Sequence, residues 1–190
     1  MLSACGTIGP ERGVDSHTYL LDPGLPAAQP GAVHGGMVQV AAPSVRAGYD
    51  TADMVYTRRP YELEYYALNE WASPPAAMLQ PLVVRTLEAA GITTLVTSAG
   101  GRETRWRLDT ELLELAHAHD EAGSTGQVAL WAQLTRMDRS GTVSTRRFEA
   151  RRPASAAEPY AGVAAMNEAL GDVLNELAEF VGATLAAHTR

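Results

Sequence analysis

The second half of the chain changes from a two-residue to a helical hydrophobic period, and this change restricts the possible folds more than any other feature. Between residues 104 and 116, and again between residues 128 and 134, large and mostly apolar side chains alternate with others. Successive side chains of a strand point to opposite faces of a sheet, so both segments are predicted as half-buried strands. The positions that share a face are Trp106, Leu108, Thr110 and Leu112 in the first segment, and Val128, Leu130, Ala132 and Leu134 in the second.

Turn-forming residues separate these strands. Ser124-Thr125-Gly126 is predicted as one turn, and Asp138-Arg139-Ser140-Gly141 as a tight turn into a third strand over residues 142–151. Arg151-Arg152-Pro153 is expected to end the sheet there. Three strands joined by short turns predict an antiparallel meander.

A long helix is predicted at the end of the chain, where apolar residues recur at three- and four-residue steps. Ser155 and Glu158 have the spacing of a capping box, although Pro159 leaves the start of the helix open. The residues that form the apolar stripe are Val163, Met166, Leu170, Val173, Leu174, Leu177 and Val181.

The first half contains shorter elements. We expect strands at residues 17–21, 37–40, 54–56, 63–68 and 92–96, with Pro60 in the turn of a hairpin between the third and the fourth. Ser73 is expected to cap a helix whose first turn holds proline, and Gly91 to close it. Its apolar stripe is Met78, Leu79, Leu82, Val83 and Leu87.

These patterns predict an α+β fold: a mixed, mostly antiparallel sheet with two amphipathic helices packed on it. Residues 17–190 are expected to form one domain. Residues 1–16 are expected to be a flexible tether, and residues 22–36, rich in Gly, Pro and Ala, a loop.

The tether contains the only cysteine, Cys5, which cannot form an internal disulfide. Leu2-Ser3-Ala4-Cys5 matches a bacterial lipobox, the site where a signal peptide is cut and the cysteine is lipidated. A precursor would also need a basic and an apolar region before this site, so we expect that the leader has been trimmed. The alternative is a terminal cysteine without a role. Gly6 follows Cys5, and by resemblance to sorted lipoproteins the absence of Asp there favours the outer membrane.

The charge argues against nucleic-acid binding. The net charge is −7, and all 15 cationic residues are arginine. Nucleic-acid binders normally carry an excess of basic residues, so no nucleic-acid partner is predicted.

Known catalytic motifs do not occur: there is no G-x-S-x-G, P-loop, H-E-x-x-H or G-x-G-x-x-G pattern. We therefore predict a protein that is not an enzyme and needs no cofactor. His117 and His119 share a strand face and could reach one metal ion, but no third ligand is evident, so two solvated histidines and no metal are predicted. The carboxylates Glu62, Glu64 and Glu70 lie near aromatic residues, as in a sugar-cleaving site, but a solvated strand face is favoured.

Arginines gather around the last predicted hairpin. They could hold anionic headgroups or an acidic partner surface, or they could form an outer strand face balanced by nearby acids. The candidates for an anionic-ligand cluster are Arg136, Arg146, Arg147 and Arg151, with Arg139 and Arg152 close in sequence.

Several stretches together resemble the ABC-type transport auxiliary lipoprotein family, which includes lipoproteins of the paraquat-inducible protein C type. They are a Tyr-Leu-Leu-Asp-Pro stretch at residues 19–23, a segment at 49–58 with Met-Val-Tyr, a Trp-Ala-x-Pro-Pro-x-x-Met-Leu junction at 71–79, and Ala-Met-Asn-x-Ala-Leu at 165–170. The motif residues that we single out are Tyr49, Met54, Tyr56, Trp71, Pro74, Pro75, Met78, Leu79 and Met166.

The resemblance implies an accessory of an ABC transporter that contains a mammalian-cell-entry (MCE) protein. It implies a lipoprotein anchored in the outer membrane through Cys5, facing the periplasm of a Gram-negative bacterium and docking the MCE component. Such systems move phospholipid or other hydrophobic molecules between the two membranes. A homo-oligomer is also implied.

Alternative roles remain open at this stage. One is a structural or assembly lipoprotein of the envelope without lipid handling, and another is a periplasmic enzyme or metal protein that uses His117 and His119. Trp71, Pro74 and Pro75 are expected to fix a strand-to-helix junction. Tyr56, Tyr65 and Tyr66 could face the core or line an apolar groove, with the core favoured.

Overall fold

The computed structural model describes residues 15–24, 34–95, 104–138 and 141–188. Within them it has nine strands in one mixed sheet and two helices. The predicted α+β class, with a mixed and mostly antiparallel sheet, is confirmed. Cys5, Arg139 and most of the predicted tether lie outside the described residues.

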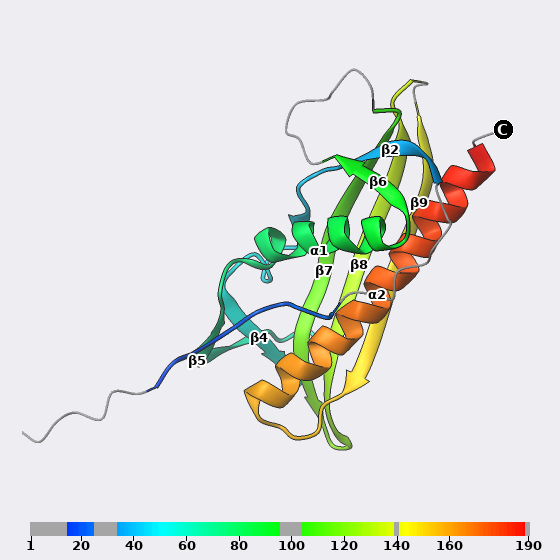
Figure 1. Cartoon of the computed structure of the whole chain (residues 1–190). Coiled ribbons are helices and arrows are strands. Elements are labelled where there is room, and N and C mark those ends of the chain that lie inside the picture. Colours follow the sequence, from blue (N-terminus) through cyan, green and yellow to red (C-terminus); the bar gives the residue numbers. More distant parts are fainter. Residues whose placement is uncertain (1–14, 25–33, 96–103, 139–140, 189–190) are drawn as a thin grey trace, which may run out of the picture.

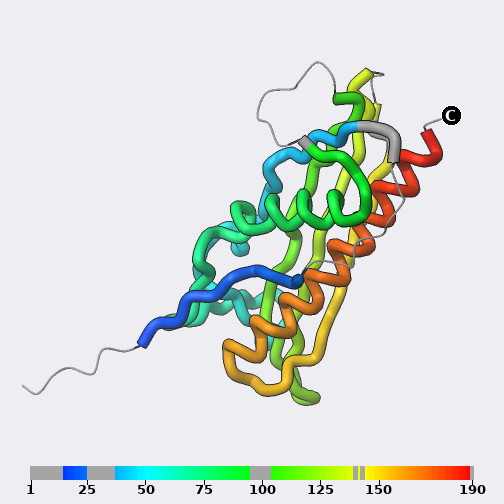
Figure 2. Tube along the Cα trace, in the orientation of Figure 1, coloured from blue at the N-terminus to red at the C-terminus, as the bar shows by residue number. Residues whose placement is uncertain are grey.

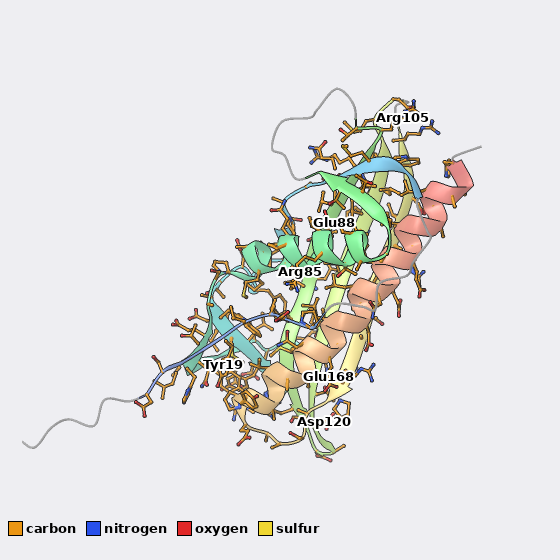
Figure 3. All side chains as sticks on the ribbon, viewed as in Figure 1. Tyr19, Arg85, Glu88, Arg105, Asp120 and Glu168 are labelled. Carbon is orange, nitrogen blue, oxygen red and sulfur yellow. The ribbon has the colours of Figure 1, made fainter. Side chains whose placement is uncertain are left out.

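Three long strands form one side of the sheet, with the third at its edge (Figure 1). They are β7 (Trp106–Asp120), β8 (Gly123–Arg136) and β9 (Thr142–Pro153), paired as an antiparallel meander. Arg105 and Asp120 mark the two ends of β7 (Figure 3). The alternation predicted for β7 and β8 is confirmed, because each of the eight residues assigned to one face is buried.

Two boundaries of the meander were predicted wrongly. Ser124, Thr125 and Gly126 are not a turn but part of β8, and the turn lies at Glu121 and Ala122. A Cβ on Gly126 would lie 2.2 Å from the backbone nitrogen of Met166, so this glycine lets a helix approach the strand. The sheet also does not end at residue 151, since β9 continues to Pro153 at an exposed edge.

Shorter strands pair with the other edge of β7. β2 (His34–Val40), β3 (Ser44–Val45) and β4 (Asp53–Thr57) each run parallel to it, one after another along its length. β2 therefore begins inside the segment that was expected to be a loop. The predicted hairpin is confirmed, as β5 (Glu64–Trp71) pairs antiparallel with β4.

The two remaining strands lie at the margins. β1 (His17–Tyr19) pairs parallel with β5, and β6 (Ile92–Leu95) pairs parallel with β2. β1 is shorter than the strand expected over residues 17–21.

The closing helix α2 (Pro159–His188) crosses β7, β8 and β9 and buries its predicted stripe against them (Figure 1). All seven stripe residues are at most 6% exposed. A Cβ on Gly162 would lie 2.3 Å from Nδ1 of His117, so Gly162 and Gly126 together allow a close contact between helix and sheet.

The other helix, α1 (Pro75–Ala89), lies across the same side of the sheet as α2 (Figures 1 and 2). Ser73 does not cap it: the N-cap is Pro74, with ψ of 140°, and no side chain caps the helix. A residue that precedes proline is held extended, so the helix starts only at Pro75. Gly91, with φ of 78°, ends it as predicted.

The face of the sheet opposite α1 and α2 is covered by no helix within the described residues (Figure 1). Neither described helix has the length and apolar character needed to cross a membrane. The core lies between the sheet and the helices, and its largest fully buried side chains include Phe148, Met54, Leu79 and Met166.

Candidate functional site at the β4–β5 hairpin

The tip of the β4–β5 hairpin holds an unusual tyrosine. Tyr61 follows Pro60 in the turn, is fully exposed, and has φ of 70°, the one non-glycine residue in the described part of the chain with a positive φ. A bulky residue in this conformation costs free energy. Tyr61 therefore carries a backbone strain without burying its ring in this chain.

Other apolar side chains of the hairpin are also exposed. Leu63, Tyr65 and Leu68 are 37%, 45% and 41% exposed. The Tyr65 hydroxyl donates to the carbonyl of Gly48 at 3.1 Å, and a Cβ on Gly48 would lie 2.7 Å from Leu63. The loop at residues 46–49 is thus packed against the hairpin, and we call the two together the hairpin surface.

A cavity of about 630 Å³ opens at this surface. Its cationic lining includes Arg46, Arg58, Arg59 and Arg151, and its acidic lining includes Glu62, Glu114 and Asp120. Within the described residues, neither Arg46 nor Arg151 has an ion pair with an acid. Within the described part of the chain, two guanidinium groups without an ion pair therefore line the same cavity as Tyr61.

The hairpin carboxylates are engaged by neighbouring side chains. Arg58 forms an ion pair with Glu64, to which the Tyr56 hydroxyl also donates at 2.8 Å, and these hydrogen bonds lower the pKa of Glu64 to about 2. Arg59 binds Glu62 at 2.7 Å. Thr18 donates to Glu70 at 3.4 Å. Glu64 is therefore a fixed anion at neutral pH and no proton donor.

Behind the hairpin lies a polar cluster formed by Tyr66, His117 and His119. The Tyr66 hydroxyl is 2.9 Å from Nδ1 of His117 and 3.2 Å from Nε2 of His119. Burial raises the pKa of Tyr66 to about 12, with a further contribution from Tyr56. Burial lowers the pKa of His117 to about 4, helped by the charge of His119, and burial also lowers the pKa of His119.

The histidines are thus not the solvated pair that the sequence suggested. His117 is fully buried beneath the first turns of α2, and His119 is half-buried. The His-x-His spacing on a strand indicates that the two histidines share a face. Tyr66 lies 51 residues before His117, so its place beside the histidines could not be predicted without the pairing of β4, β5 and β7.

Most of the family-motif residues lie in the core. Pro75 is buried, Met78 is packed against the core, Pro74 is exposed at the start of α1, and Tyr56 is half-buried. Tyr66 is half-buried as well, whereas Tyr65 is exposed. The buried hydrophobic motif residues are Tyr49, Met54, Trp71, Leu79 and Met166.

The four arginines proposed as one cluster are not brought to one place. Arg136 pairs with Asp138 at the end of β8, Arg146 with Glu176 on α2, and Arg147 with Glu149 on β9. Arg151 lines the cavity at the hairpin surface. Of the four, Arg151 is the one that the structure places near other candidate residues.

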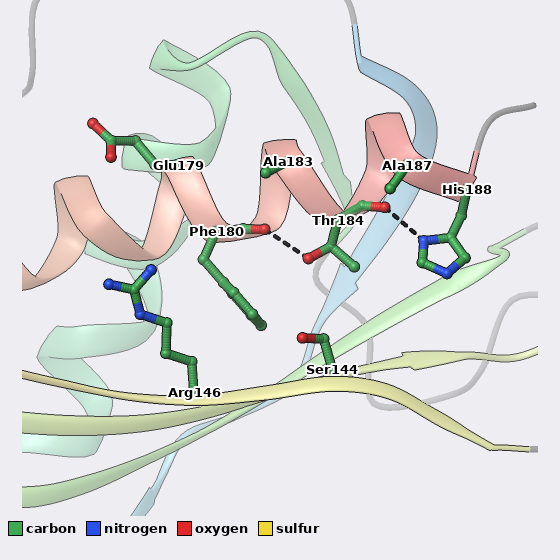
Figure 4. A pocket seen from close by; sticks show the side chains of 8 residues that line it. All are labelled: Ser144, Arg146, Glu179, Phe180, Ala183, Thr184, Ala187 and His188. Carbon is green, nitrogen blue, oxygen red and sulfur yellow. Dashed lines mark hydrogen bonds between the residues drawn. The ribbon is translucent and has the colours of Figure 1, made fainter.

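A second cavity, of about 480 Å³, lies between β9 and the C-terminal half of α2 (Figure 4). Several of its polar groups are already used within the chain: the Thr184 hydroxyl donates to the carbonyl of Phe180, and Nδ1 of His188 lies 2.8 Å from the carbonyl of Thr184. This leaves fewer free groups for a ligand than at the hairpin surface.

Comparison with known proteins agrees with this fold. The solved structure of protein XCC0632 from Xanthomonas campestris, assigned to the DUF330 family, superposes with a TM-score of 0.77 at 25% identity, over 90% of this chain and 97% of that one. A hypothetical protein, CT253, from Chlamydia trachomatis superposes with a TM-score of 0.56 at 9% identity, over 80% of this chain and 99% of that one, which shows the fold alone. No curated protein matches this sequence.

A family model for the ABC-type transport auxiliary lipoprotein component matches residues 19–178. The match runs from β1 through most of α2 and includes the hairpin, the polar cluster and all nine motif residues. The chain therefore belongs to the family of ABC-type transport auxiliary lipoprotein components.

Proposed function

We propose that this protein is a non-enzymatic accessory that docks the MCE-domain protein of an ABC transport system through the hairpin surface. It is lipidated at Cys5, anchored in the outer membrane and exposed to the periplasm. The system it serves moves phospholipid or other hydrophobic molecules between the inner and outer membranes.

The observation that carries the docking role is the exposure of Tyr61 in a strained backbone conformation. Strained residues persist where the surrounding structure holds them, and they concentrate at functional sites. Tyrosine and arginine are also the residue types that contribute most at protein interfaces. Tyr61, Leu63, Arg46 and Arg151 provide an aromatic, an aliphatic and two cationic contacts around one cavity.

We further propose a homo-oligomer that uses the sheet face opposite the helices. Trp131 lies on this face between Glu111 of β7 and Arg147 of β9. A half-buried tryptophan on an uncovered sheet face is suited to an interface between copies. Native mass spectrometry of the wild type and of Trp131→Ala measures this directly, with monomers expected for the variant.

The test of the function is a co-purification in the native host. The full-length precursor with a C-terminal tag is extracted from membranes in mild detergent, and co-purifying proteins and lipids are identified. We expect an MCE-domain protein with the wild type, loss of membrane attachment with Cys5→Ala, and attachment without the partner for the double variant Tyr61→Ala, Leu63→Ala.

Tyr160→Ala is the matched control, because Tyr160 is 68% exposed but lies on α2. It is expected to retain the partner. Recovery of an outer-membrane barrel in place of a transporter subunit would favour the structural or assembly role, and a soluble wild-type protein without a partner would contradict the proposal.

A further inference from the structure

The Tyr66–His117–His119 cluster brings three potential metal-ligand atoms together. The Tyr66 oxygen lies 2.9 Å from Nδ1 of His117 and 3.2 Å from Nε2 of His119. Around a tetrahedral Zn²⁺ with bonds of about 2.0–2.1 Å, neighbouring ligand atoms lie about 3.3 Å apart. The two distances from the Tyr66 oxygen therefore lie within a few tenths of an ångström of the spacing in a metal site.

The three residues are held by rigid elements. His117 and His119 are two apart on β7 and so share a face, while Tyr66 comes from β5, with β4 paired between these strands. The ring of Tyr56 packs against that of Tyr66 at 4.5 Å between centroids, and Gly162 of α2 closes over His117. Little side-chain entropy is left to lose when a ligand binds.

Access from solvent also suits a metal ion. His119 and Tyr66 are half-buried, and His119 lines the cavity at the hairpin surface. An ion can thus approach from solvent, and a fourth coordination position can be filled by water.

We propose that Tyr66 Oη, His117 Nδ1 and His119 Nε2 form a three-ligand site for a divalent transition-metal ion. Imidazole is a good ligand for both Cu²⁺ and Zn²⁺, and the Irving–Williams order makes Cu²⁺ the tighter of the two. On binding, the Tyr66 hydroxyl releases its proton to solvent and coordinates as phenolate. This inference does not depend on the proposed docking function.

The test uses the full chain with Cys5→Ser, which removes a competing thiol, after dialysis against a chelator. Cu²⁺ and Zn²⁺ are added separately, and bound metal is measured by equilibrium dialysis. We expect one ion per chain and about 100-fold weaker binding for His119→Ala. With Cu²⁺, a visible phenolate-to-copper charge-transfer band is expected.

Tyr66→Phe is the second variant, because it keeps the ring packed and removes only the oxygen. It is expected to lose the charge-transfer band and to bind more weakly, while Tyr56→Phe, the neighbouring control, keeps both. Binding that is absent, or that is unchanged in both His119→Ala and Tyr66→Phe, would overturn the proposal.

Discussion

Two regions of the molecule differ in how they use their hydrophobic residues: the strands under α2, and the β4–β5 hairpin. Under the body of α2, the strands β8 and β9 bury alternate apolar side chains such as Leu130, Leu134 and Phe148, each at most 1% exposed. Near the start of α2, the β4–β5 hairpin leaves Tyr61, Leu63, Tyr65 and Leu68 exposed. The first region is completed by contacts within the chain, whereas the second keeps apolar and aromatic surface available for contacts outside it.

The largest expected effect tests the close packing of the first region. A Cβ on Gly126 would lie 2.2 Å from the backbone of α2, where a clash is relieved only if the helix moves. We expect Gly126→Ala to lower the free energy of unfolding by about 4 kcal/mol or to prevent folding. Urea denaturation followed by circular dichroism measures it.

Gly171→Ala is the matched control for that variant. Gly171 lies in the middle of α2, and a Cβ there meets only ordinary contacts with Pro23 at 3.5 Å. Alanine is favoured over glycine in a helix, so this variant is expected to gain about 0.5–1 kcal/mol. A stability of Gly126→Ala equal to that of the wild type would show that α2 does not pack closely on β8.

Acid stability tests the boundary between the two regions, where His117 lies. The pKa of His117 is lowered to about 4 in the folded protein, mainly by burial and also by the charge of His119, against about 6.5 when unfolded. Above pH 6.5 neither state binds the proton, and between pH 6.5 and 4 only the unfolded state does. The metal-free protein should therefore lose up to about 3 kcal/mol of stability as the pH falls through this window.

Other groups around His117 set the control for this measurement. His119 and Tyr66 face it, and Glu64 and Arg58 lie on the adjoining hairpin. The His117→Gln variant should be less stable than the wild type at pH 7. Its free energy of unfolding should fall less than that of the wild type between pH 6.5 and 4. The same pH dependence in the variant and the wild type would contradict the assignment to His117.

The smallest expected stability effect concerns the hairpin tip. Tyr61 is fully exposed with a positive φ, so Tyr61→Gly removes strain without removing buried area. We expect a gain of about 0.5–1 kcal/mol, and no comparable gain for Tyr61→Ala, which keeps the Cβ. Thermal unfolding of both variants measures the difference, and a loss of stability in Tyr61→Gly would show that the ring packs within the chain.

The sequence predicted those strands and helices whose hydrophobic residues repeat with the period of the element. The alternation in β7 and β8 and the stripe of α2 were predicted because each depends only on neighbouring residues. Gly126 was misread as a turn, since a glycine for close helix approach and a glycine for a turn look alike in a sequence.

The candidate site was less accessible to this reasoning. The His-x-His pair on β7 was noted, but Tyr66 and the parallel pairing of β4 with β7 arise from tertiary structure. The exposure and positive φ of Tyr61 likewise follow from how the hairpin turns, which residue type alone does not reveal. Local patterns thus predicted the covered region better than the exposed one.

Site-specific photo-crosslinking tests the central claim most directly. A photoreactive amino acid is introduced at Tyr61 of the full-length precursor in its native host, and in a second strain at Asn175, an exposed position on α2. We predict a crosslink from position 61 to an MCE-domain protein and none from position 175. A crosslink to that protein from position 175 but not from position 61 would contradict docking through the hairpin surface.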